Sequence, residues 1–151
     1  MGTWGYGIFE NDSAADWVYA YESDGAVAVE RALSAVSDAI GQGHLDADTA
    51  AIALGAAEAI AFAAGVPSSA VNQETLETFA RHSEAVHAIP EGPLRALKVV
   101  ASIFGRGPDG VRLESELLDL WSEEDVAKDD FDGFKQTVQD LAIRLKRVMQ
   151  A

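Results

Sequence analysis

Residues 49–65 carry only one charged side chain, Glu58, in a stretch made mostly of alanine. A capping aspartate, Asp46 or Asp48, precedes this stretch, and a glycine and a proline follow it, so the sequence predicts a helix over about 47–64. A helix that is apolar almost all round must be covered by other elements on several sides. The stretch therefore predicts a domain that is built around one central helix.

The other periodic segments also predict helices, because apolar residues recur at steps of three and four between capping residues and glycine or proline turns. The predicted helices cover about 13–22, 25–41, 73–82, 92–104 and 113–121, followed by a C-terminal helix with a stripe of Phe131, Phe134, Val138, Leu141, Leu145 and Val148. Only Val111–Leu113 is a weak candidate for a strand. The sequence thus predicts an all-α fold in a single domain over residues 1–151, with a bundle of six or seven helices in residues 13–150.

The charge of the chain is strongly negative and uneven. The formal net charge at pH 7 is −14, of which −12 falls in residues 1–91. A field of that sign repels nucleic acid and anionic lipid and favours cationic partners. No segment has the pattern of a signal peptide or the roughly 20 apolar residues of a membrane span, and the absence of cysteine suits a reducing compartment. We therefore expect a cytoplasmic protein that binds neither nucleic acid nor membrane.

The N-terminal stretch is rich in glycine and aromatic residues, and residues 1–21 hold six of the twelve aromatics in the chain. A phosphate-binding glycine loop follows a strand, but no strand is predicted here, and the nearby Glu10 and Asp12 would repel phosphate. The sequence favours a structural role, in which residues 1–12 form an extended clamp whose aromatic side chains fill grooves between helices. The residues assigned to this structural motif are Trp4, Gly5, Gly7, Phe9, Asn11, Asp12, Asp16 and Trp17.

Two stretches of the chain resemble a known family. Residues 1–17 follow the order M-G-x-W-G-x-G-x-F-x-N-D-x-A-x-D-W, and residues 115–121 read SELLDLW, which is similar to S-E-L-x-x-L-W. Both stretches resemble the family called domain of unknown function 4259, as does the alanine-rich middle helix with one glutamate. The resemblance implies a small, mainly helical, mostly bacterial domain. It implies no activity, substrate or catalytic residue.

Among the acidic residues of this chain, Glu58 is the one whose pKa we most expect to differ from its ordinary value. A buried glutamate without a cationic partner has a raised pKa, which is how a general acid or base is made. One interpretation is that Glu58 pairs with Arg31, or accepts hydrogen bonds from backbone amides of the glycine-rich N-terminus and anchors that segment. The other is a small hydrolase or isomerase in which Glu58 works with Asp12 or Asp16. The structural interpretation is favoured, because structural ion pairs also perturb pKa values.

Asp12 and Asp16 lie four residues apart and share one face of the first predicted helix. Two carboxylates at this spacing can bind a divalent cation, but sites built from oxygen ligands usually need more than two of them. Acidic residues also suit the positive N-terminal end of a helix. We therefore expect no metal and no cofactor.

The stretch 114–132 holds nine acids and one lysine, with three leucines and Trp121 among them. Large apolar residues at helical spacing are usually buried, which favours a core position for Trp121. The alternative is a tryptophan within an acidic docking surface for a basic partner, and the residues of this candidate surface are Glu116, Asp119, Trp121, Glu123 and Glu124.

The function predicted from the sequence is a non-enzymatic protein-interaction module that binds a basic protein. An immunity-like or antitoxin-like role is one concrete form of it. Self-association into a homo-oligomer through apolar helix faces is a further alternative.

Overall fold

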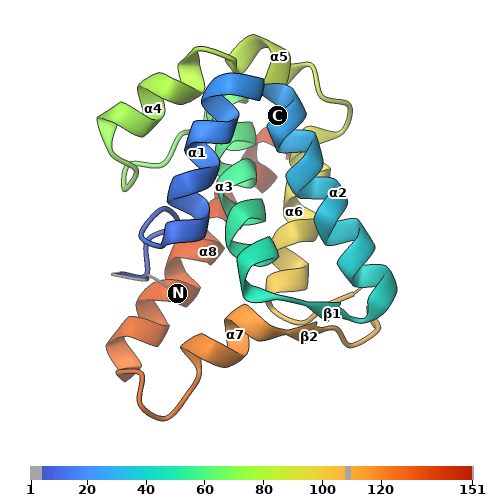
Figure 1. The fold of residues 1–151 in the computed structure, drawn as a ribbon, viewed down its shortest axis with the longest axis vertical. Helices are drawn as coiled ribbons and strands as arrows, with labels where there is room; N and C mark the ends of the chain where they lie inside the picture. Colours follow the sequence, from blue (N-terminus) through green and yellow to red (C-terminus); the bar gives the residue numbers. More distant parts are fainter. Residues whose placement is uncertain (1–4, 108–109, 151) are drawn as a thin grey trace.

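Eight helices and two short strands make up residues 5–107 and 110–150, which the computed structural model describes (Figure 1). The prediction of an all-α bundle is confirmed. The helices are α1 (Asp12–Asp24), α2 (Ala26–Gln42), α3 (Ala47–Ala63), α4 (Gln73–Ala80), α5 (Ser83–His87), α6 (Gly92–Ile103), α7 (Glu116–Trp121) and α8 (Lys128–Gln150), and the strands are β1 (His44–Leu45) and β2 (Glu114–Ser115).

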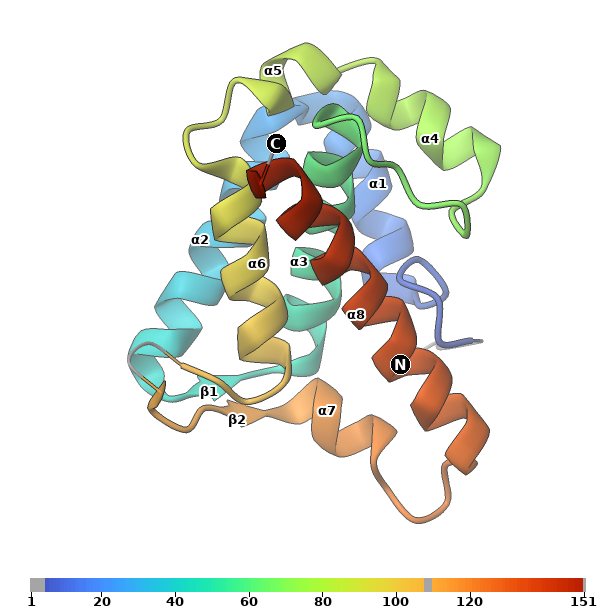
Figure 2. The same ribbon diagram turned by 180° about the vertical axis from the view of Figure 1, so that it is seen from behind.

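The central helix is α3, as its composition predicts. It contacts all seven other helices, and in both views α1, α2, α6 and α8 lie around it (Figures 1 and 2). Twelve of its residues are buried, and their small side chains let the surrounding helices approach closely. Among the described residues, none of the helices is both long and apolar enough to cross a membrane.

Side-chain caps fix where three of the helices begin. Asn11, Asp46 and Asn72 each accept a hydrogen bond from the backbone N–H three residues later, at 2.9, 2.8 and 2.8 Å. The bond from the Thr49 backbone also lowers the pKa of Asp46. A glycine marks the C-terminal end of α2, where Gly43 adopts a φ of 77°, a conformation that glycine accepts at no steric cost. These local signals explain why most predicted helix ends lie within two residues of the observed ones.

The region after α4 differs from the prediction of one helix over 73–82. The helix α4 ends at Ala80, and a separate short helix, α5, follows it. The break between the two helices coincides with a contact to α1. The His82 ring packs edge-on against Tyr21, and its Nε2 lies 3.0 Å from the Glu22 backbone oxygen.

The two strands were also not predicted, and the weak strand candidate Val111–Leu113 is not a strand, although β2 begins at the next residue. They pair in parallel, with His44 opposite Glu114 and Leu45 opposite Ser115, so α7 begins at Glu116 instead of 113. Strands of two residues carry no alternation that a sequence pattern could reveal. The pairing joins the end of α2 to the start of α7 (Figure 2).

Candidate functional site

Residues 5–10 form a loop before α1 that packs across α3 and α8 through its side chains. Ile8 is buried, whereas Tyr6 is 44% exposed. The Phe9 ring lies over Gly55, where an added Cβ would come within 3.0 Å of Phe9 Cε1, and the Tyr6 ring lies over Gly133, where a Cβ would come within 2.7 Å of Cζ. Two aromatic rings of the loop therefore pack directly on glycines, one in α3 and one in α8, and these contacts position the loop. Trp4, which belongs to the same predicted motif, lies outside the described residues.

Gly5 and Gly7 make room for the carboxylate of Glu10. A Cβ at Gly5 would come within 2.6 Å of Glu10 Oε2, and one at Gly7 would overlap Glu10 Oε1. Glu10 Oε1 accepts a hydrogen bond from the Gly7 backbone N–H at 3.1 Å. Gly7 does not have a φ in the left-handed region, so the available space explains this glycine better than conformational freedom does. The sequence analysis did not identify Glu10 as part of the motif's structure.

Asn11 and Trp17 complete the structural motif. The Asn11 side chain caps α1 and also donates to the Ile8 backbone oxygen at 3.1 Å. Trp17 is buried and its indole N–H points to the Ala28 backbone oxygen at 3.4 Å. These two residues therefore fix the position of the loop and of α1.

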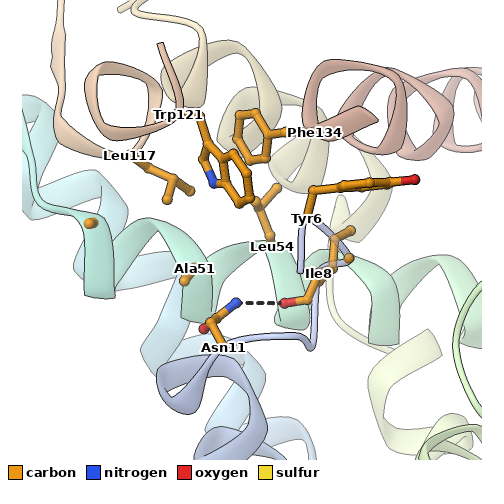
Figure 3. A pocket seen from close by; sticks show the side chains of 10 residues that line it. Tyr6, Ile8, Asn11, Ala51, Leu54, Leu117, Trp121 and Phe134 are labelled. Atoms are coloured by element: carbon orange, nitrogen blue, oxygen red, sulfur yellow. Dashed lines mark hydrogen bonds between the residues drawn. The ribbon is translucent and has the colours of Figure 1, made fainter. Parts of the chain in front are cut away.

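A small apolar pocket lies where the two family-like stretches meet (Figure 3). Its wall comes from the N-terminal loop with the N-cap of α1, and from α3, α7 and α8; the lining residues are Tyr6, Gly7, Ile8, Asn11, Ala47, Ala51, Leu54, Leu117, Trp121 and Phe134. Trp121 stacks on Phe134 with ring centroids 5.3 Å apart and planes 10° apart. The free volume is about 30 Å³, enough for about one or two waters. The pocket is thus a junction between elements with no room for a substrate.

The SELLDLW stretch, residues 115–121, stabilises this junction through a helix cap, a hydrogen bond and apolar packing. Ser115 caps α7, and Glu116 Oε1 accepts a hydrogen bond from the Ala47 backbone at the start of α3, at 2.9 Å. Leu117 is buried, and Trp121 is half-buried. The expectation that Trp121 is a core residue is therefore met only in part, because its ring packs on Phe134 but the residue is only half-buried.

Glu58 is buried in α3, with only 2% of its surface exposed, and it is bound by Arg144 of α8. Arg144 Nη1 and Nη2 donate to the two carboxylate oxygens at 2.8 and 2.7 Å. Arg144 Nε donates to Asp140 at 2.7 Å, and Nη1 also donates to the Val66 backbone oxygen at 3.0 Å. One guanidinium group thus joins α3, α8 and the segment after α3.

The predicted pairing of Glu58 with Arg31 is wrong, because Arg31 pairs with Asp24 at 2.8 Å and both oxygens of Glu58 are bonded to Arg144. Among the described residues, Glu58 accepts no hydrogen bond from a backbone amide of the N-terminal loop. The predicted contact with residues 1–4 lies outside the part of the chain that the structure describes. Arg144 was not predicted as the partner of Glu58. A signal was present, because Arg144 lies three residues after Leu141 and next to Leu145 on the apolar stripe.

The charge state of this pair follows from burial and bonding. Burial raises the pKa of Glu58, and the hydrogen bonds and charge of Arg144 oppose that rise. Burial would lower the pKa of Arg144, but its bonds to Glu58 and Asp140 outweigh this and raise it. Two short charge-assisted bonds to one carboxylate favour the ionised pair at neutral pH.

The structure does not bring Asp12 and Asp16 to Glu58. Both aspartates are exposed on α1. Glu58 lines a cleft between the N-terminal loop, residues 68–72 and α8, here called the Glu58 cleft, and neither aspartate is among the residues that line it. Within residues 5–107 and 110–150, no group of three or more His, Asp or Glu side chains could hold a metal ion.

The candidate acidic surface lies on α7 and the turn that follows it. Glu116, Asp119, Glu123 and Glu124 are exposed around the half-buried Trp121. In the described part of the chain, Asp119, Glu123 and Glu124 form no ion pair. This surface therefore combines uncompensated negative charge with a half-buried tryptophan.

Comparison with known proteins gives one match. The family model described as Domain of unknown function (DUF4259) matches residues 2–137. This range includes both family-like stretches and Glu58, and it ends within α8 before Arg144. Neither a curated protein nor a solved structure matches the chain. Because the match covers most of its length, the chain belongs to the DUF4259 family, a family of domains of unknown function.

Proposed function

We propose that this chain is a non-enzymatic protein-interaction module that binds a basic protein through the acidic surface of Glu116, Asp119, Trp121, Glu123 and Glu124. The observation that carries the proposal is the half-buried Trp121 among exposed acids that have no cationic partner in the described residues. Asp125 is also exposed and extends this charge along the turn.

The physical basis is complementarity of charge around an aromatic anchor. Tryptophan is enriched among the residues that dominate binding energy. Acids around such an anchor steer a cationic partner and suppress acidic competitors. The net charge of −14 adds a long-range field of the same sign.

The catalytic alternative has less support. Both oxygens of Glu58 are bonded to Arg144, and Asp12 and Asp16 are exposed away from the cleft that Glu58 lines. A general acid or base must reach the reacting atom directly or through one water. The pairing of Glu58 instead suits a clamp between α3 and α8.

An immunity-like or antitoxin-like protein that blocks a basic toxin is one concrete form of this function. A small acidic domain without cysteine suits such a role in a reducing cytoplasm. The binding site would then be the acidic surface itself, with the partner's lysine and arginine residues over Glu123 and Glu124. Self-association stays a separate prediction that the acidic surface does not favour, because like charges repel.

The test compares wild type with a charge-reversed variant, Glu123→Lys, Glu124→Lys and Asp125→Lys. Wild type is immobilised, proteins retained from host lysate at low salt are purified, and their affinities are measured by calorimetry. A matched control carries Glu74→Lys, Glu77→Lys and Glu84→Lys on α4 and α5, where the three glutamates are also exposed. Each triple variant changes the net charge from −14 to −8, so a general charge effect alters both variants equally.

We expect a basic partner whose affinity falls only in the Glu123 variant. Each reversal removes an attraction of roughly 0.5 kcal/mol and adds a similar repulsion, so three reversals cost about 3 kcal/mol, or on the order of 100-fold in Kd at low salt. The proposal fails if both variants weaken binding equally, or if the retained partner is acidic.

A further inference from the structure

The Glu58 cleft is the largest concave feature near the N-terminal loop that the proposed function does not use. It encloses about 520 Å³ and is lined by Tyr6, Gly7, Ile8, Phe9, Glu10, Glu58, Ser68, Ala70, Val71, Asn72 and Thr137. Three segments far apart in the sequence form its walls: the N-terminal loop, the connection between α3 and α4, and α8. These segments lie side by side in both views (Figures 1 and 2).

The charge around the cleft is negative. Glu10 and Glu58 line it, and no lysine, arginine or histidine of the described residues does. Arg144, which binds Glu58, also donates to Asp140, so its one positive charge is shared between two carboxylates. With Glu10 at the mouth, the local balance is about two negative charges, which favours a cation in the cleft.

The polar atoms in the cleft wall include acceptors with free capacity. Each Glu58 oxygen accepts one bond from Arg144 and keeps a lone pair, and Glu10 Oε2 has no partner among the described residues. The Thr137 hydroxyl donates its proton to the Gly133 backbone oxygen, which leaves its lone pairs available. An ammonium can donate to these acceptors, and the lining also contains donors in the Ser68 hydroxyl and the Asn72 amide.

The remaining wall is apolar. Ile8, Phe9, Ala70 and Val71 contribute aliphatic and aromatic surface beside the carboxylates. A methylene chain fits this surface while the charged end faces the acids, as in the side chain of lysine. We propose that the Glu58 cleft binds an alkylammonium group, with Glu10 at its mouth and the Glu58–Arg144 pair at its floor.

Two sources can supply that group, a free aliphatic amine or the lysine side chain of a protein. The inference does not depend on the acidic surface, because the cleft shares no residue with it. The two proposals therefore fail separately, since charge reversal at Glu123, Glu124 and Asp125 leaves the cleft lining unchanged.

The experiment titrates ¹⁵N-labelled protein with n-butylammonium chloride at constant ionic strength and follows amide shifts by NMR. Butyrate and n-butanol, which have the same chain length without the positive charge, serve as ligand controls. Ala70→Trp fills the cleft, and Ala80→Trp on exposed α4 is its matched control outside the lining. Glu10→Gln removes one charge while keeping an acceptor for the Gly7 N–H.

We expect saturable shifts at residues 7–10, 68–72 and 137 with a Kd of about 1–10 mM, typical of a ligand with five heavy atoms. Ala70→Trp should abolish these shifts, Ala80→Trp should leave them unchanged, and Glu10→Gln should raise the Kd about fivefold, the effect of one partly screened charge. Absence of saturation, equal binding of butyrate, or unchanged Kd values in both Ala70→Trp and Glu10→Gln would overturn the proposal.

Two further ligands assign the source. Binding of 1,5-diaminopentane that is tighter than that of Nα-acetyl-lysine methylamide indicates a free amine. Equal or tighter binding of the blocked lysine indicates a lysine side chain. Both results support an alkylammonium site, and binding of neither contradicts it.

Discussion

Replacing Arg144 by methionine is expected to cost about 3–5 kcal/mol of unfolding free energy at neutral pH, the usual cost of removing one partner from a buried ion pair. Methionine keeps most of the aliphatic length, so packing changes little, but Glu58 stays buried at 2% exposure without its cation. Asp140 adds little to the cost, because its side chain is 60% exposed and water can solvate it. In a domain of 151 residues, a loss of about 4 kcal/mol lowers Tm by roughly 8–16 °C.

The deficit of Arg144→Met should depend on pH with a defined sign. Without Arg144, burial raises the folded pKa of Glu58 further above its unfolded value of about 4.3. Between these two pKa values the folded protein binds a proton that the unfolded chain does not, so the unfolding free energy falls as pH rises. The difference from wild type should therefore be small near pH 4 and reach its full size above the folded pKa.

Urea denaturation followed by circular dichroism at several pH values measures these free energies. A double variant, Glu58→Leu with Arg144→Met, replaces both charges by apolar groups and should lie within about 1–2 kcal/mol of wild type. Arg147→Met makes the same change at an exposed site of α8 and should shift stability by no more than about 0.5 kcal/mol. A cost below about 1 kcal/mol for Arg144→Met, or a double variant as unstable as the sum of its single variants, would refute the clamp.

Two further predictions concern the core. Tyr21→Phe should cost about 1–2 kcal/mol in thermal or urea unfolding, because the buried hydroxyl donates to the Phe79 backbone oxygen at 2.8 Å. Burial raises the pKa of Tyr21 to about 12, so a titration of wild type followed by absorbance at 295 nm should show a step near pH 12 that the variant lacks. Because the pKa of an unfolded tyrosine is about 10, the Tyr21 hydroxyl should also lower the unfolding free energy of wild type as the pH rises above about 10. Gly55→Ala should lower Tm by roughly 3–6 °C in calorimetry, because the new Cβ meets Phe9 at 3.0 Å and Trp17 at 3.4 Å and overpacking outweighs the gain in helix propensity. An added Cβ at Gly41 meets nothing within 4 Å, so Gly41→Ala should raise Tm slightly. A rise of Tm in Gly55→Ala as well would show that the Phe9 and Trp17 rings move aside at little cost, which contradicts the prediction.

Local signals in the sequence were sufficient to locate most helices. Residues 49–65, which are apolar apart from Glu58 and Thr49, predict a central helix, and a cap such as Asp46 predicts where it begins. These features act within one or two turns, so they are visible in the order of residues alone. The short helix α5 and the strands β1 and β2 depend on contacts with other elements, and their sequences carry no period long enough to predict them.

The candidate site was predictable only in outline. The sequence indicates that Glu58 needs a partner and that the N-terminal glycines and aromatics form a structural segment. It does not reveal that Gly5 and Gly7 accommodate Glu10, or that Tyr6 is seated on Gly133. Those contacts depend on how an irregular loop folds back on itself and on the helices, for which no periodic rule exists.

The sequence by itself determined where most of the helices lie, because helix periodicity and capping are local. Only the tertiary structure decided that Glu58 pairs with Arg144, 86 residues away, and that Trp121 and the N-terminal loop share one pocket. Pairings of this kind depend on the rotation and tilt of each helix against its neighbours. Those angles are set by the packing of all side chains at once, so no single stretch of sequence contains them.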